Sequence, residues 1–76
     1  MKYRNDNYYY NIIRKNITKY RKEKNITQKE LAKRIGYSVS YLNAIESKVK
    51  KKTFSIIILG RIADVLDINI KEFFNK

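Results

Sequence analysis

The sequence contains no cysteine, no histidine and no proline. Without cysteine there is neither a disulfide framework nor a thiolate nucleophile, and without histidine the commonest general base and metal ligand are missing. The seven aspartate and glutamate residues are scattered along the 76 positions and form no pair of the kind that acts in acid–base catalysis. We therefore expect a chain that is not an enzyme and that uses no metal and no cofactor.

Long apolar runs are also missing. The longest one, FSIIILG at residues 54–60, is far shorter than the ~18 apolar residues that cross a bilayer. The N-terminal sequence MKYRNDNYYY has no apolar segment like that of a signal peptide. Together with the absence of cysteine, which suits a reducing compartment, these features predict a soluble protein of the cytoplasm without membrane contact.

Positive charge is what the sequence has in excess. Eighteen lysine and arginine residues against seven acidic ones give a net charge of +11. A field of this sign attracts polyanions, either nucleic acid or an anionic membrane surface. A bias of AT-rich coding toward lysine, asparagine, isoleucine and tyrosine produces the same excess. A membrane-surface helix is disfavoured because the apolar residues are divided among several short segments.

Apolar residues recur at steps of three and four, which together with the absence of proline predicts an all-α fold. We expect five short helices: one from between residues 7 and 11 to about 24, then 28–35, 38–46 and 55–66, and a last one from about residue 70. Residues 1–10 are expected to form a partly frayed, tyrosine-rich extension, and 11–76 a single domain. The expected core residues are Ile13, Ile17, Tyr20, Leu31, Ala32, Ile35, Leu42, Ile45, Ile56, Leu59, Ile62, Ala63 and Leu66.

Local signals mark the helix ends. Thr27 and Glu30 have the spacing of a capping box, in which each side chain accepts a hydrogen bond from the backbone amide of the other. Gly36 is expected to end the helix because glycine adopts a positive φ, and Ser38 is expected to cap the next helix. Gly60 lies inside a helical pattern, at a cost of about 1 kcal/mol relative to alanine, and marks a close contact or a kink.

The segment TQKELAKRIGYSVSYLNAIE, residues 27–46, resembles the helix-turn-helix of the phage repressor and Cro type, the XRE-like bacterial regulators. Within residues 28–47 the alanine falls fifth, the glycine ninth, and the buried aliphatic residues fifteenth and eighteenth. The flanks YRKEKNIT and RIADVLDINIKEFF are similar to the family's first helix and its last two helices. The resemblance implies a compact, five-helix, lambda-repressor-like domain.

The resemblance also implies that the helix 38–46 is a recognition helix, which enters the DNA major groove. The residues at the base-reading positions are Ser38, Val39, Ser40, Asn43 and Ala44. Asn43 can pair with adenine, whereas Val39 and Ala44 can meet only apolar groups such as a thymine methyl, so an A·T-rich site is expected. The plainer interpretation of Val39 and Ala44 is that they are small residues on a helix surface.

Phosphate contacts and one ion pair follow from the same resemblance. The residues assigned to phosphate contact are Gln28, Tyr41, Lys48, Lys50, Lys51 and Lys52. A lysine run is often only a solvated loop, but its place beside the recognition helix favours phosphate contact. This loop lacks the family's usual glycine and proline and is longer. Arg21 and Glu46 are expected to pair and hold the recognition helix. Arg14, Lys15, Lys19 and Lys22 are expected on the polar surface of the first helix, and no specific contact is assigned to them.

The sequence therefore predicts a double-stranded-DNA-binding transcriptional regulator, a repressor encoded by a bacterium or phage and found on the nucleoid when bound. The chain ends where the DNA-binding domain ends, so we expect no separate effector domain. One recognition helix covers few base pairs, so a homodimer is expected. The alternative is an antitoxin or anti-repressor of the same fold that masks a partner protein. The residues available for a dimer or a partner are Tyr8, Tyr9, Tyr10, Phe73 and Phe74.

Overall fold

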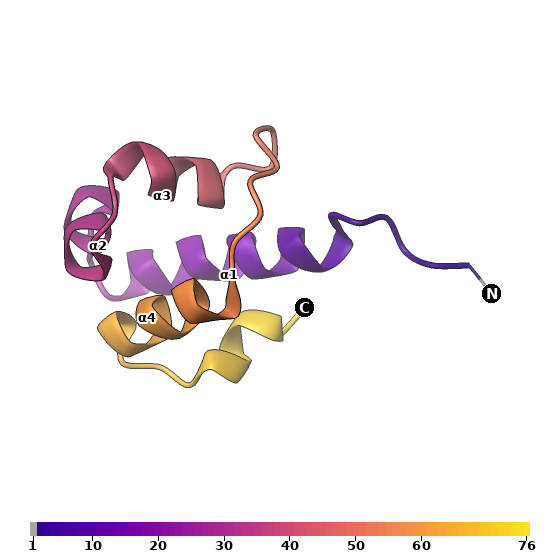
Figure 1. Cartoon of the computed structure of the whole chain (residues 1–76). Helices are drawn as coiled ribbons and strands as arrows, with labels where there is room; N and C mark the ends of the chain where they lie inside the picture. Colours follow the sequence, from indigo (N-terminus) through magenta and orange to yellow (C-terminus); the bar gives the residue numbers. More distant parts are fainter. Residues whose placement is uncertain (1) are drawn as a thin grey trace.

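The computed structural model describes residues 2–76, and these residues form four α-helices and one 3₁₀ helix. The longest helix, α1, runs through the middle of the molecule, with α3 on one side and α4 with η1 on the other, while α2 closes one end (Figure 1). The prediction of an all-α fold is confirmed for these residues. The elements are α1 Tyr8–Glu23, α2 Gln28–Ile35, α3 Val39–Glu46, α4 Ile56–Leu66 and η1 Ile70–Phe74.

The expected fifth helix is present as a 3₁₀ helix, so the prediction of five helices is corrected to four α-helices and η1. Its first turn closes with a hydrogen bond from the amide of Glu72 to the carbonyl of Asn69, three residues back. The side chain of Asn69 caps the amide of Lys71. A segment of five residues is too short to gain much from α-helical bonding, and short terminal turns commonly adopt this tighter form.

Hydroxyl caps begin three of the α-helices. Thr27 accepts from the amide of Glu30 at 3.1 Å, Ser38 caps α3 in the same way, and Ser55 caps α4. The expected capping box is only half formed, because the Glu30 carboxylate accepts from Arg34 at 2.7 Å rather than from the Thr27 amide. The pairing with Arg34, four residues further along α2, is the usual helical ion-pair spacing.

The core is one cluster to which every helix contributes. It contains the predicted residues of α1, α2 and α3, with Tyr20 packed at its edge. On α4 the prediction of Ile56 is wrong: its side chain is 63% exposed, and Ile58 is buried instead. Ile56 is the first residue of α4 and lies at the edge of the buried face, which is formed by Ile58, Leu59, Ile62, Ala63 and Leu66. The buried hydrophobic residues are Ile13, Ile17, Leu31, Ala32, Ile35, Leu42, Ile45, Phe54, Ile58, Leu59, Ile62, Ala63, Leu66 and Phe73.

The C-terminal helix η1 is held against α1 by polar contacts that the sequence did not indicate. Asn16 is buried on α1, and its amide donates to the carbonyl oxygens of Phe73 at 2.9 Å and Asn75 at 2.6 Å. One turn further on, the Tyr20 hydroxyl lies 3.3 Å from a carboxylate oxygen of Glu72. Asn16 thus satisfies backbone carbonyls at the end of η1, which helps to bring the C-terminus onto the middle of α1 (Figure 1).

The tyrosine-rich start is divided between two environments. Helix α1 begins at Tyr8, so the three consecutive tyrosines form its first turn. Tyr10 packs edge-on against Phe54 with ring centroids 4.9 Å apart, whereas Tyr9 is 59% exposed. Residues 2–7 lie outside the helices, and residue 1 of the expected extension falls outside the described part. No helix within residues 2–76 is long and apolar enough to span a membrane.

The two glycines are expected to respond oppositely to alanine. Gly36 has φ +82°, so Gly36→Ala should lower the free energy of unfolding by about 1–2 kcal/mol, the cost of a left-handed backbone for a residue with a Cβ. A Cβ at Gly60 meets no heavy atom within 4 Å, so there is no close contact there, and Gly60→Ala should raise the free energy by about 0.5–1 kcal/mol. Urea unfolding followed by circular dichroism measures both, and shifts of the same sign would contradict this account.

Candidate nucleic-acid interface

Helix α3 is fastened to the core along one edge and exposed along the other. Leu42 and Ile45 are fully buried, so the helical repeat turns Val39, Ser40 and Asn43 toward solvent. Glu46, at the C-terminal end, is the only charged residue of α3. The exposed surface is therefore small and uncharged, whereas a solvated helix surface usually carries lysine and glutamate. Such a surface can approach another molecule closely.

The five predicted base-reading residues lie on or beside this surface. Ser38, Val39, Ser40 and Asn43 are exposed, and Ala44 is half-buried. Ser38 is also the N-cap of α3, since its hydroxyl oxygen accepts from the Tyr41 amide at 3.1 Å. That bond leaves the hydroxyl hydrogen of Ser38 free to donate. Contact of the five residues with bases stays a prediction.

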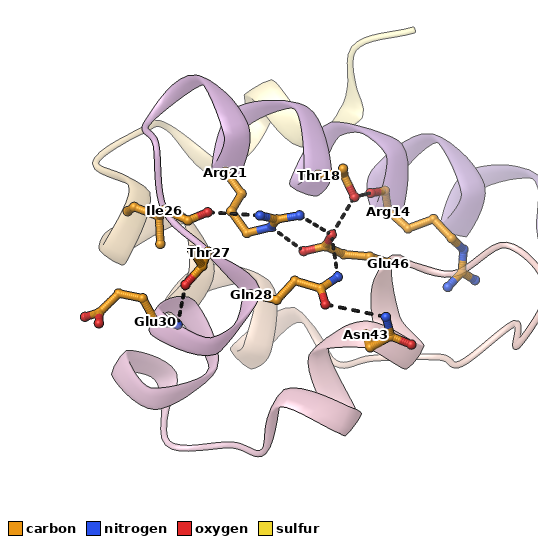
Figure 2. A network of polar contacts seen from close by, with 9 residues as sticks. All are labelled: Arg14, Thr18, Arg21, Ile26, Thr27, Gln28, Glu30, Asn43 and Glu46. Atoms are coloured by element: carbon orange, nitrogen blue, oxygen red, sulfur yellow. Dashed lines mark hydrogen bonds and ion pairs between the residues drawn. The ribbon is translucent and has the colours of Figure 1, made fainter.

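The C-terminal end of α3 is held by an ion pair to α1 (Figure 2). The Arg21 guanidinium donates from Nε and Nη2 to the two carboxylate oxygens of Glu46, at 2.9 and 3.0 Å. Thr18 donates its hydroxyl to the same carboxylate at 2.8 Å, and Arg21 Nη1 donates to the Ile26 carbonyl at 2.9 Å. The two side chains of the pair are only 10% and 5% exposed. A two-bonded pair in this environment fixes both distance and orientation.

A chain of side-chain amides extends this network toward the exposed edge of α3 (Figure 2). Gln28, the first residue of α2, donates to Glu46 at 3.1 Å and accepts from Asn43 at 3.4 Å. Asn43 in turn accepts from the ammonium of Lys50 at 2.8 Å. Gln28, predicted as a phosphate contact, and Asn43, predicted as a base contact, are thus oriented by each other before any ligand binds.

The four predicted phosphate-contacting lysines are all exposed, in the segment that joins α3 to α4. Two of them return toward α3: Lys50 bonds to Asn43, and the ammonium of Lys52 lies 5.5 Å from the centre of the Tyr41 ring. Tyr41 is half-buried and packs edge-on against Tyr37 at 4.5 Å. Burial raises the pKa of Tyr41, and the neighbouring Tyr37 adds to the shift. Its phenol therefore stays protonated at neutral pH and can donate a hydrogen bond.

The expectation that Arg14 lies on the polar surface of α1 is wrong. Its side chain is fully buried. Its Nη1 donates to the carbonyl oxygens of Ile45 at 2.8 Å and Lys52 at 3.0 Å, and its Nε donates to Asn11 at 3.0 Å. Burial lowers the pKa of the guanidinium below its usual value. The spacing of seven residues between Arg14 and Arg21 places both on one face of α1. This spacing is the feature of the sequence that could have indicated that Arg14, like Arg21, faces α3.

The described residues offer no metal centre. Within residues 2–76, no group of three or more histidine, cysteine, aspartate or glutamate side chains is placed to hold a metal ion. Of the carboxylates near α3, Glu46 is already occupied by Arg21, Thr18 and Gln28. The interface is therefore built from helix ends, amides and lysines rather than from ligands of a cation.

Comparisons with known protein families and with curated proteins all identify helix-turn-helix proteins. A sequence model of the helix-turn-helix family matches residues 17–73. The HTH-type transcriptional regulator SinR of Bacillus licheniformis is 35% identical over 65 residues, which cover 86% of this chain and 58% of that protein. The SinR of Bacillus subtilis (strain 168) is 37% identical with the same coverage. The chain thus spans little more than half the length of these curated relatives.

Solved structures show the same fold. The crystal structure of SinR, the master regulator for biofilm formation, in complex with DNA matches with a TM-score of 0.73 and 35% identity, covering 83% of this chain and 98% of that one. The restriction-modification controller protein C.AhdI from Aeromonas hydrophila matches with a TM-score of 0.81 and 25% identity, covering 92% of this chain and 100% of that one.

Loss of one partner of the Arg21–Glu46 pair is expected to cost more than loss of both. Glu46→Leu leaves the guanidinium buried and unpaired, which should lower the free energy of unfolding by about 3 kcal/mol. The double variant Arg21→Met/Glu46→Leu should recover most of this loss, because apolar side chains can replace a buried pair at little net cost. Urea unfolding of the three variants and the parent chain measures both effects.

The matched control is the same exchange at an exposed pair. Glu30 and Arg34 are 44% and 51% exposed, so Glu30→Leu should cost no more than about 1 kcal/mol. Equal losses for Glu30→Leu and Glu46→Leu would show that the network in Figure 2 contributes no more than a surface ion pair.

Proposed function

This chain belongs to the XRE-type helix-turn-helix family, and we propose on that basis that it is a sequence-specific DNA-binding transcriptional regulator that acts as a repressor. The observation that carries the proposal is the exposed, uncharged surface of α3, fastened from behind by the Arg21–Glu46 pair. A relative solved in complex with DNA supports it. A repressor acts on the chromosome, so the proposal also places the protein in the cytoplasm, on the nucleoid when bound.

In this function α3 enters the major groove and the surrounding groups bind phosphates. Val39, Ser40 and Asn43 face the base edges, and the apolar Val39 favours a thymine methyl. The amides at the start of α2 and the lysines after α3 bind the phosphates beside the groove, and their closeness to α3 supports this role, since Gln28 and Lys50 both bond to Asn43. Lysine–phosphate contacts supply affinity, whereas the groups on α3 supply the discrimination between sequences.

We further propose that two copies associate through an apolar groove between the start of α1, the start of α4 and the end of η1. The groove has a volume of about 210 Å³ and unites the tyrosine-rich start with the C-terminal helix, two surfaces between which the sequence does not choose. None of its lining residues belongs to α3, so the α3 helix of each copy stays available for one of two half-sites about 34–36 Å apart, one turn of DNA. The lining residues are Tyr9, Tyr10, Ile13, Phe54, Ile56, Leu59 and Phe74.

The same groove favours a second candidate function, that of an antitoxin or anti-repressor. Tyr9, Ile56 and Phe74 are 59%, 63% and 49% exposed, and apolar groups gathered at a groove commonly mark a protein-binding surface. In this function the groove binds a different protein, and DNA recognition is secondary. The oligomeric state of the isolated chain and its preference among DNA sequences separate the two candidates.

The DNA-binding proposal predicts a strong preference for the operator. In fluorescence anisotropy, the native chain should prefer the duplex upstream of its own gene over a shuffled duplex by about a thousandfold or more. The double variant Val39→Glu/Ser40→Ala should lose this preference, because its carboxylate meets the base edges and phosphates. Lys71→Gln, which shifts the net charge by the same one unit on η1, should keep it.

The test should not depend on the upstream duplex being the operator. The native chain is therefore also used to enrich duplexes from a random-sequence pool, and its binding to these is measured in the same way. Equal and steeply salt-dependent binding to every duplex would contradict sequence-specific recognition, since phosphate attraction alone gives that pattern. It would favour the partner-binding function.

The dimer proposal predicts that a charge in the groove weakens self-association. Phe74→Asp alters a side chain that is 49% exposed, so the fold should persist while the dimer dissociation constant rises about tenfold or more, the effect of ~1.4 kcal/mol. Sedimentation velocity over a range of concentrations measures the change. The control Val49→Asp alters an apolar residue that is 89% exposed outside the groove, and an equal effect of both variants would contradict the assignment.

A further inference from the structure

The segment 47–55 between α3 and α4 contains no helix or strand and carries four exposed lysines within five residues. Repulsion among like charges and the absence of regular hydrogen bonding both favour an open, variable segment. Side chains of the segment make contacts near both of its ends. At the start, the Ser47 hydroxyl accepts from the Lys50 amide at 3.3 Å and the Lys50 ammonium bonds to Asn43. At the end, Phe54 is buried in the core and Ser55 caps α4. A side chain from outside the segment, that of Arg14, also bonds to its backbone, at the carbonyl of Lys52.

We propose that Arg14 is the positioning residue of this basic segment, which it holds beside α3 so that its lysines face the same DNA as the recognition helix. Its Nη1 joins the carbonyl of Ile45, in the last turn of α3, to the carbonyl of Lys52, at the far end of the lysine run. That the lysines face DNA rests on the proposed function. That Arg14 holds the segment beside α3 concerns only the protein and does not depend on that function.

The chemistry of the site suits an arginine. The Ile45 carbonyl belongs to the last turn of α3, where backbone carbonyls lack helical partners and a positive charge is favourable. The guanidinium carbon lies 5.9 Å from the Tyr10 ring centre and 5.6 Å from that of Phe54, within the range of cation–π attraction. Its Nη2 is buried and has no hydrogen-bond partner within residues 2–76. A planar fork can reach several acceptors at once, whereas a lysine ammonium is a single point.

The position of the segment determines where its charges lie. With the Lys52 carbonyl fixed, the Lys52 ammonium lies over Tyr41 and the Lys50 ammonium bonds to Asn43, so both stand along α3. Ordering these side chains before binding reduces the conformational entropy lost on DNA contact. Arg14 therefore acts on DNA through the lysines and makes no contact with it.

The first test needs no DNA. Trypsin cleavage of the native full chain, resolved by mass spectrometry, gives the ratio of cleavage after the loop lysines to cleavage after Lys15 and Lys19 of α1. Arg14→Met should raise this ratio about tenfold or more, because cleavage follows the population of the open segment. Arg14→Lys should raise it less. The control Leu66→Ala, a core truncation in α4, destabilises the whole fold and raises cleavage after Lys15 and Lys19, so it should not raise the ratio.

The second test measures phosphate contacts. The slope of log K against log salt changes by about 0.9 for each phosphate contact, so Arg14→Met should reduce its magnitude by about 2 if two lysines lose their positions. In a chain that already carries Lys50→Gln and Lys52→Gln, Arg14→Met should change the slope no further. If Arg14→Met does not fold, Arg14→Lys is measured in both tests.

The outcomes separate the inference from the proposed function. An unchanged cleavage ratio overturns the positioning role of Arg14, whatever the DNA result. A raised ratio with an unchanged slope overturns the link between the segment and phosphate. Absence of sequence preference in the native chain overturns the proposed function, while the cleavage ratio still decides the role of Arg14.

Discussion

The ion pair between Arg21 and Glu46 is the constraint on which the exposed surface of α3 depends. A helix of eight residues is too short to persist in water by itself, so its position must come from tertiary contacts. Leu42 and Ile45 supply burial, but apolar packing alone permits some rotation and sliding. The two parallel hydrogen bonds at Glu46 remove that freedom at the end of the helix. The geometry of α3 is thus set from α1.

Helix α1 holds a neighbouring helix by polar contacts on each of two sides. Arg14, Thr18 and Arg21 follow one another at steps of four and three, and all bond to α3 or to the segment after it. Asn16 and Tyr20 lie on the opposite side and bond to η1 and the C-terminus. The side of α1 that orients α3 is therefore distinct from the side that holds η1 beside the apolar groove. None of the residues that line the groove belongs to α3, so the proposed association does not use the exposed surface of that helix.

Local signals account for what the sequence predicts well. The hydroxyl caps, Gly36 and the three- and four-residue apolar steps act within one turn of helix, so α2 and α3 follow from neighbouring residues alone. The prediction that Ile56 is buried was wrong because three isoleucines follow Ser55 in a row. The sequence alone does not reveal which of them begins the buried face of α4. The roles of Arg14 and Asn16 depend on carbonyls 31 and 57 residues away, which no local pattern contains.

The distribution of charge follows from this arrangement. Glu46 is the only ionised group of α3, and Arg21 neutralises it inside the protein, so the outward surface of the helix carries no charge of its own. The charge that attracts a polyanion lies next to α3, on the lysines, two of which touch its side chains. Attraction to phosphate is insensitive to sequence, whereas groove contacts discriminate. The two contributions reside on different segments. In the proposed function they act on the same stretch of DNA only while those segments hold a fixed distance.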